Sequence, residues 1–283
     1  PTIQKIKAIT IRQRLGKLIS AKTFATWPRS SAYYKRNAWA GKYEFNGKKI
    51  YDSPMMNAVA HFLQNMLYVA GAGPHSSACP VKIYSENYRA KEIASADTQY
   101  LRLYTDTGVK IQFIATHAVA NSEMAGPITE YQYEKGKISW CLWPDGQTEV
   151  FKKQGNRLTK TDTFYNRSSL LTDVFIQTLN AVRERKLPLS TITNAKQHIL
   201  CINKMFVSSQ GITPVTAPYT RALPVSFEDY DPSLDVSREK NIIIRGLKKA
   251  VIKMHDLEKS FYESGLEWAC PGDTITTEKE LKC

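Results

Sequence analysis

The chain has 283 residues, 42% of them hydrophobic, and a net charge of +13 at neutral pH. It can bury a substantial core in one large or two modest domains, which excludes disorder over the whole length. No run of about 18 apolar residues is present, which excludes a membrane-spanning helix. The five cysteines are scattered and form no Cys-x-x-Cys pair. This pattern argues against a disulfide framework or a metal site, so we expect reduced thiols and a cytoplasmic protein.

The positive charge is concentrated in the first 50 residues, where twelve Lys or Arg face the single acid Glu44. Such charge is typical of nucleic-acid binders, because Lys and Arg neutralise phosphates. The chain begins at Pro1 without an initiator Met, so we expect a preceding segment, which would balance this charge if it is acidic. We therefore expect no nucleic-acid partner.

In chain order, the first predicted element is a short basic helix over residues 2–14. Its isoleucines recur at near-helical spacing, and Gly16 ends the run. Alternating residues over 18–25 then predict a strand. This strand leads into an aromatic loop over residues 27–41.

The next predicted element is an apolar helix over residues 52–71. Asp52 or Ser53 is expected to cap its first N–H groups, and Pro54 suits the first helical position. Gly71 is expected to end the helix in a left-handed conformation.

Alternating segments follow, and Asp106-Thr107-Gly108 between two of them is a strong hairpin signal. Together they predict an antiparallel meander of at least five strands. The segments are residues 81–84, 100–104, 109–114, 128–133, 138–143 and 148–152.

Helical spacing returns from Ser168 to Val182 and over residues 193–207, and a last helix is predicted over 247–262. Residues 210–240 are rich in Pro, Ser, Thr and Asp and predict a long loop before a short strand at 241–245. The predicted fold class is α+β, with a single predominantly antiparallel sheet and helices on one face.

Sequence motifs for nucleotide binding are absent. No Gly-x-Gly-x-x-Gly follows a strand, and no Walker motif occurs. The chain therefore does not bring a nucleotide site of its own, and no metal site is expected.

Two histidines are candidates for proton transfer, because imidazole titrates near neutral pH. His61 belongs to a polar stripe on the 52–71 helix, and Asn57 lies one turn earlier, where it is expected to orient the ring. The alternative for His61 is a core histidine satisfied by a hydrogen bond. His117 ends a strand, and its alternative is a residue that faces solvent.

The aromatic loop combines rings with cationic and amide donors, which suits a polyhydroxylated ligand such as a sugar. Single-stranded RNA is an alternative ligand, and packing of the rings under the sheet is the structural alternative. The candidate substrate-binding residues are Tyr34, Arg36, Asn37, Trp39 and His117.

Six motifs occur along the chain: Trp27-Pro28-Arg29, Tyr33-Tyr34-x-Arg36-Asn37-x-Trp39-Ala40-Gly41, Asp52-Ser53-Pro54-x-x-Asn57-Ala58-x-Ala60-His61, Asn65-Met66-Leu67-Tyr68, Thr116-His117-Ala118-Val119 and Glu263-Ser264-Gly265-Leu266-Glu267-Trp268-Ala269. Together they resemble the C-terminal substrate domain of Gfo/Idh/MocA-type oxidoreductases, over nearly the whole chain.

The resemblance implies a Rossmann domain before Pro1, with NAD or NADP as cofactor. Residues 1–16 would be the connecting helix, and 17–283 the substrate-binding and oligomerisation domain, which forms a homo-oligomer through its sheet. In this family the corresponding helix often carries Asp-x-x-x-His. His61 matches the His, but Asn57 replaces the Asp and offers no charge to an imidazolium.

The leading hypothesis is the substrate-binding portion of an NAD(P)-dependent oxidoreductase that acts on a sugar, inositol or related polyol, with His61 and Asn57 as catalytic residues. The chain alone is expected to be inactive without its cofactor domain. One alternative is an NAD-dependent glycosidase-like enzyme of the same superfamily. Another is a non-catalytic carbohydrate-binding or scaffold module.

Overall fold

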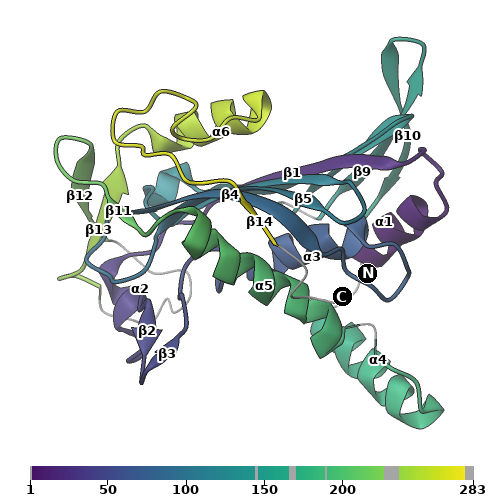
Figure 1. Ribbon diagram of the computed structural model, residues 1–283, viewed down its shortest axis with the longest axis horizontal. Helices are drawn as coiled ribbons and strands as arrows, with labels where there is room; N and C mark the ends of the chain where they lie inside the picture. The colour runs from purple at the N-terminus through teal and green to yellow at the C-terminus, as the bar shows by residue number, and fades with distance from the viewer. Residues whose placement is uncertain (1, 144–145, 166–169, 189, 226–235, 278–283) are drawn as a thin grey trace.

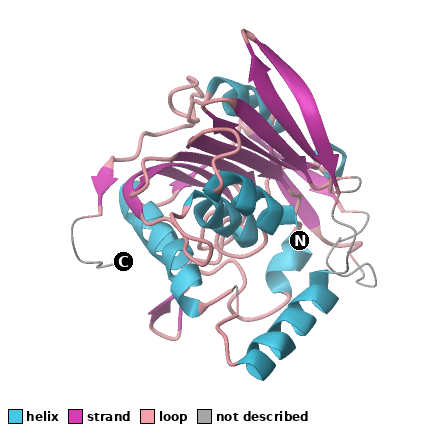
Figure 2. Ribbon diagram, turned by 90° about the vertical axis from the view of Figure 1, so that its right-hand side faces the viewer, coloured by secondary structure: helices cyan, strands magenta, loops and turns pink. Residues whose placement is uncertain are grey.

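The computed structural model describes residues 2–143, 146–165, 170–188, 190–225 and 236–277. Ten of the described strands form one sheet in the order β10-β9-β8-β7-β1-β6-β5-β4-β11, with β14 also paired to β4 (Figures 1 and 2). These strands are β1 Leu18–Thr26, β4 Pro80–Arg89, β5 Thr98–Thr105, β6 Lys110–Thr116, β7 Ala125–Tyr133, β8 Gly136–Cys141, β9 Thr148–Gln154, β10 Arg157–Phe164, β11 Thr213–Pro214 and β14 Ile275–Thr276.

Two small hairpins and six α-helices complete the described chain, together with a short 3-10 turn at Asn121–Glu123. None of the described helices is long and apolar enough to cross a membrane. The hairpins pair β2 Glu44–Phe45 with β3 Lys48–Lys49, and β12 Thr220–Pro224 with β13 Lys240–Ile244. The helices are α1 Thr2–Ile11, α2 Ser31–Lys35, α3 Ala60–Ala70, α4 Leu170–Glu184, α5 Ile192–Ser208 and α6 Leu247–Leu257.

The sheet is mixed, which corrects the predicted meander. Strand β1 lies between β6 and β7 and runs parallel to β6, with Ala21 opposite Ile111. Strand β11 is also parallel to β4, while the other neighbours in the sheet are antiparallel. Alternation identified the strands but not their order, because a central strand and an edge strand share the same period of two.

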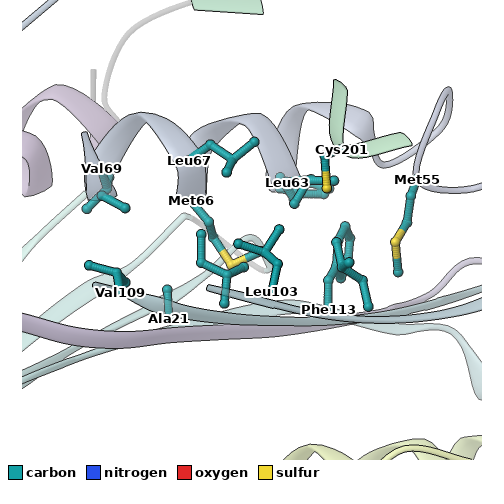
Figure 3. Packing of buried hydrophobic residues seen from close by; sticks show 14 of the residues in the cluster. Ala21, Met55, Leu63, Met66, Leu67, Val69, Leu103, Val109, Phe113 and Cys201 are labelled. Atoms are coloured by element: carbon teal, nitrogen blue, oxygen red, sulfur yellow. The ribbon is translucent and has the colours of Figure 1, made fainter. Parts of the chain in front are cut away.

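The main core lies between one face of the sheet and helices α1, α3 and α5. Figure 3 shows Met66 of α3 pointing toward Leu103 of the sheet, and Leu63, Leu67 and Phe113 belong to the same cluster. All five of these side chains are buried. The spacing of three and four residues along α3 places its apolar side chains on this one face.

Helix α6 covers the opposite face of the sheet, so the prediction of helices on one face is wrong (Figure 1). Val251 and Met254 of α6 are buried in a second cluster with Phe24 and Ile114 of the sheet. The reason lies in β1 and β6, whose apolar side chains point to both faces and therefore require cover on both.

The helix expected from Asp52 begins later, at Ala60. The residues before it form successive turns, in which Asn57 N donates to Ser53 O over 3.0 Å and Val59 N donates to Pro54 O over 2.9 Å. At the other end, Gly71 is extended and not left-handed, with φ −65° and ψ 150°. A glycine is required there because an added Cβ would lie 2.0 Å from the carbonyl oxygen of Ser76.

Other boundaries also differ from the predictions. The aromatic loop contains α2, β10 was not predicted, and the last helix ends at Leu257 because Glu258 is left-handed. The expected 210–240 loop contains β11 and β12, while its residues 226–235 lie outside the described residues.

Helix α4 confirms the helical spacing predicted after Ser168, but no other described element covers its apolar face. Phe175 is 71% exposed and Val182 is 72% exposed. Figure 1 shows α4 extending away from the sheet. The pattern of apolar residues therefore predicted the helix correctly without predicting what it packs against.

Candidate functional site

The candidate site is built on the chain that leaves β1. Trp27 N donates to Thr116 O over 2.9 Å, which ties the start of the aromatic loop to the end of β6. Ser30 then caps α2, since its Oγ accepts a hydrogen bond from Ala32 N over 3.0 Å.

After α2 the chain forms a compact turn, Asn37–Lys42, which we call the dividing loop. Asn37 Oδ1 accepts hydrogen bonds from Trp39 N over 3.1 Å and from Ala40 N over 2.8 Å. An Asn side chain that satisfies two backbone N–H groups in this way fixes a turn without regular secondary structure. It also fixes its own amide, because the oxygen faces the loop and the NH₂ group faces away.

Asp52 is the centre of the site and is only 5% exposed. Its Oδ2 accepts from Gly41 N over 2.6 Å, and its Oδ1 accepts from Asn57 Nδ2 over 2.8 Å. The Arg36 guanidinium lies 3.5 Å from Oδ2 and stacks on Tyr33, with 3.7 Å between Cζ and the ring centroid. A buried carboxylate needs such partners to offset its desolvation. Asp52 therefore joins α2, the dividing loop and the turns before α3.

The first cavity, called here the Trp39 cavity, has a volume of about 420 Å³. Its polar groups are Asp52 and Asn57, and the rest of its lining is apolar or aromatic. Because Asn57 Nδ2 donates to Asp52, the amide oxygen of Asn57 is left as the acceptor. The lining residues are Trp39, Phe45, Ile50, Asp52, Met56 and Asn57.

The second cavity, called here the Lys42 cavity, has a volume of about 620 Å³. Three segments form it: α2 with the dividing loop, the connection from β4 to β5, and the chain that enters β13. Tyr34 and Asn37, both predicted to bind substrate, line this cavity.

His117 lies behind Tyr34 and not at the surface, so the alternative of a solvent-facing residue is wrong. Its Nδ1 is 2.8 Å from Tyr34 Oη, and the residue is 2% exposed. Burial holds the pKa of His117 well below its usual value, and the nearby charges of Arg29, Lys91 and Arg36 lower it further. The imidazole is therefore neutral near pH 7.

His61 lies on the first turn of α3 with an exposed side chain, so it is not the buried core histidine of the alternative reading. Its ring contacts Phe62, with 3.9 Å between the centroids. It does not line either of these cavities, and the amide NH₂ of Asn57 bonds to Asp52.

The structure therefore brings Arg36, Trp39 and Asn57 together around Asp52, and Tyr34 together with His117. Sequence reasoning treated Asp52 as a helix cap and missed this role. The distribution of charge along the sequence could have indicated this role, because Glu44 and Asp52 are the only acidic residues among the first 57. A buried position among so many cations favours a carboxylate partner.

The resemblance places the NAD or NADP site in a domain before Pro1, and the described residues show no dinucleotide site of the usual kind. A dinucleotide fold holds the pyrophosphate at a glycine-rich turn between a strand and a helix N-terminus. The turn from β1 to α2, Trp27-Pro28-Arg29-Ser30, has no glycine, and the turn from β13 to α6 has the single glycine Gly246. We therefore assign the cofactor to no described residue.

No family model matches the sequence, and no curated protein matches it. Solved structures match the fold. The WlbA dehydrogenase of Bordetella pertussis, in complex with NADH and UDP-GlcNAcA, has a TM-score of 0.54 at 17% identity over 74% of this chain and 58% of its own.

Two further structures are similar. Aldose-aldose oxidoreductase from Caulobacter crescentus, complexed with glycerol, has a TM-score of 0.56 at 10% identity, over 74% of this chain and 58% of its own. An oxidoreductase domain protein from Kribbella flavida has a TM-score of 0.59 at 11% identity, over 74% of this chain and 62% of its own. The chain therefore has the fold of these oxidoreductases and spans about three fifths of their length, and the expected resemblance is confirmed at the level of fold.

Proposed function

We propose that this chain is the substrate-binding portion of an NAD(P)-dependent oxidoreductase that acts on a sugar, inositol or related polyol. The observation that carries the proposal is the Trp39 cavity. An aromatic and apolar lining with a few fixed polar groups is typical of a small-molecule site, and 420 Å³ lies within the usual range. The solved structures with this fold include proteins whose bound molecules are UDP-GlcNAcA and glycerol.

Each lining group has a distinct role in this proposal. The Trp39 ring offers a flat apolar surface to a sugar ring, and the Asn57 amide oxygen accepts a hydrogen bond from a substrate hydroxyl. Arg36 stacks near Trp39, with 5.2 Å between Cζ and the ring centroid, and so fixes the position of the indole.

His61 is the proposed proton acceptor. When a secondary alcohol is oxidised, its hydroxyl proton must leave, and a neutral imidazole near neutral pH accepts such a proton efficiently. The His61 side chain is exposed and follows Asn57 by about one turn of the chain. In this turn Ala60 N donates to Asn57 O over 3.2 Å. NAD or NADP, if held by the domain expected before Pro1, would supply the hydride-acceptor chemistry; the WlbA structure contains NADH.

The test uses the full reading frame that encodes this chain, assayed for NADH or NADPH formation with a panel of sugars and inositols. His61→Ala is expected to lower kcat at least about 100-fold with little change in KM, because general base catalysis typically contributes this much. His75→Ala is the matched control, since His75 is also exposed but lies in the turn after α3. Equal activities of the two variants would contradict the role of His61.

The homo-oligomer through the sheet stays a prediction. The exposed part of the sheet carries ion pairs, such as Lys137 with Glu130 over 2.7 Å. Size-exclusion chromatography with light scattering tests it, and a monomeric mass at micromolar concentration would contradict it.

A further inference from the structure

The Lys42 cavity differs from the Trp39 cavity in its charge. Five basic and two acidic residues line it. Glu239 is already engaged, since Lys35 Nζ lies 2.7 Å and 2.8 Å from its two carboxylate oxygens. These hydrogen bonds, with one from Ser31, lower the pKa of Glu239. The basic residues are Lys35, Lys42, Lys91, Arg238 and Lys240, and the acidic residues are Glu92 and Glu239.

Hydrogen bonds between the three segments hold the walls of this cavity in place. Lys91 Nζ donates to Asn241 Oδ1 and to Ile242 O, both over 2.6 Å. Ala94 N donates to Gly41 O over 2.9 Å, and Lys240 N donates to Ser31 Oγ over 3.0 Å. A cavity held in this way loses little conformational freedom when a ligand binds.

Within the described part of the chain, Lys42, Arg238 and Lys240 form no ion pair, and all three are exposed. Positive charges that cluster around a cavity attract anions and raise their local concentration. These three cations therefore remain to neutralise a ligand.

Asn37 adds a fixed neutral donor. Its Oδ1 is occupied by the backbone N–H groups of Trp39 and Ala40, so its NH₂ group is the part that remains for a ligand in the cavity. The side chain thus presents a donor and no acceptor, which suits an anionic oxygen.

We propose that the Lys42 cavity binds an anionic group carried by the substrate, either a phosphate or a carboxylate attached to a sugar. This inference rests on the proposed function, and it narrows the substrate class from neutral polyols to sugar acids or sugar phosphates. A volume of about 620 Å³ is sufficient for a sugar-sized ligand. The charge-assisted hydrogen bonds from Lys42, Lys240 and Asn37 give the site its preference for the anion.

The experiment titrates the chain by calorimetry, at low ionic strength, with glucose 6-phosphate, glucuronate, inorganic phosphate and glucose. One of the two sugar anions is expected to bind at least about tenfold more tightly than glucose and than inorganic phosphate. Which one binds distinguishes a phosphate ester from a carboxylate. Binding is also expected to weaken in high salt, because the cations are exposed.

Two variants locate the binding. The pair Lys42→Ala with Lys240→Ala removes two charges and is expected to weaken binding at least tenfold. Asn37→Asp keeps an oxygen that accepts from the backbone N–H groups of the dividing loop but replaces the amide donor with a carboxylate oxygen. An equal or larger loss of anion affinity is therefore expected, without a change in Tm. Lys48→Ala with Lys153→Ala is the matched control, since it removes two exposed charges outside the cavity.

The absence of saturable binding by both sugar anions would overturn the proposal. So would equal losses in the cavity variants and the control, or equal affinity for glucose 6-phosphate and inorganic phosphate when glucuronate does not bind. Anion binding lost in the cavity variants, but without dehydrogenase activity of the full reading frame, would support the cavity and refute the proposed function.

Discussion

The two cavities lie on either side of the same loop and offer opposite hydrogen-bonding groups. Trp39 faces one cavity, whereas Ala38 and Ala40 line the other. The Trp39 cavity is apolar and presents acceptors, whereas the Lys42 cavity presents an excess of cations over the carboxylates Glu92 and Glu239, together with the Asn37 donor. The dividing loop thus separates a surface suited to a sugar ring from a surface suited to an anion.

The difference depends on how two asparagines are held. Asn37 gives its oxygen to backbone N–H groups and keeps its NH₂ group for the ligand. Asn57 gives its NH₂ group to Asp52 and keeps its oxygen. One residue type therefore provides a donor in one cavity and an acceptor in the other, and the partner decides which.

The largest effect on this arrangement is expected from Asp52→Ala. The change removes the acceptor for Gly41 and Asn57 and leaves the Arg36 guanidinium partly buried without its carboxylate. The free energy of unfolding should fall by about 4 kcal/mol, as when one partner of a buried pair is removed. Urea denaturation measures this.

Glu149→Ala is the control for that measurement, because its ion pair with Lys160 is partly exposed to solvent. Its effect should stay within about 0.5 kcal/mol. Equal effects of the two variants would show that Asp52 does not organise the site.

A smaller effect is expected from Asn57→Asp, which restores the residue that the family resemblance favours. Here it would place two carboxylates about 2.8 Å apart, and their repulsion would raise the pKa of one of them. A carboxyl pKa raised by two units costs about 3 kcal/mol of stability at pH 7, and the loss disappears as the pH falls toward 4. Thermal unfolding at pH 7 and pH 4 tests this, and a variant as stable as the wild type at pH 7 would contradict it.

The smallest effect is expected from His117→Asn, which keeps a polar atom near Tyr34 Oη. Because the pKa of His117 is lowered in the folded state, the unfolded chain binds a proton below about pH 6.5 that the folded chain does not. Stability therefore falls as the pH drops from 7 to 5, and the variant should lose about 2 kcal/mol less than the wild type over this range. Identical pH profiles would show that the pKa of His117 is not lowered in the folded state.

The sequence predicted most elements because their periods are local properties. The β5 and β6 hairpin and helices α1, α4 and α5 appear where the spacing placed them. The insertion of β1 between β6 and β7 was not predictable from alternation, since pairing order depends on contacts between distant segments. The covering of both faces by helices was missed for the same reason.

The site was partly predictable. Residue chemistry placed Tyr34, Asn37 and Trp39 in one binding loop and Asn57 beside His61, whereas these four residues line two separate cavities. The division into two cavities follows from Asp52, whose partners are spread over α2, the dividing loop and the turns before α3. Spacing along the chain does not report such contacts.

The most direct test of the two-cavity account is a crossed titration of two variants with myo-inositol and with the sugar anion that binds the wild type. The account predicts that Trp39→Ala loses affinity for inositol about tenfold and still binds the sugar anion more tightly than inositol, because the anionic group remains in the Lys42 cavity. It predicts that Asn37→Asp loses affinity for the sugar anion about tenfold and keeps its affinity for inositol. Loss of both ligands in both variants, or of neither, would contradict the account.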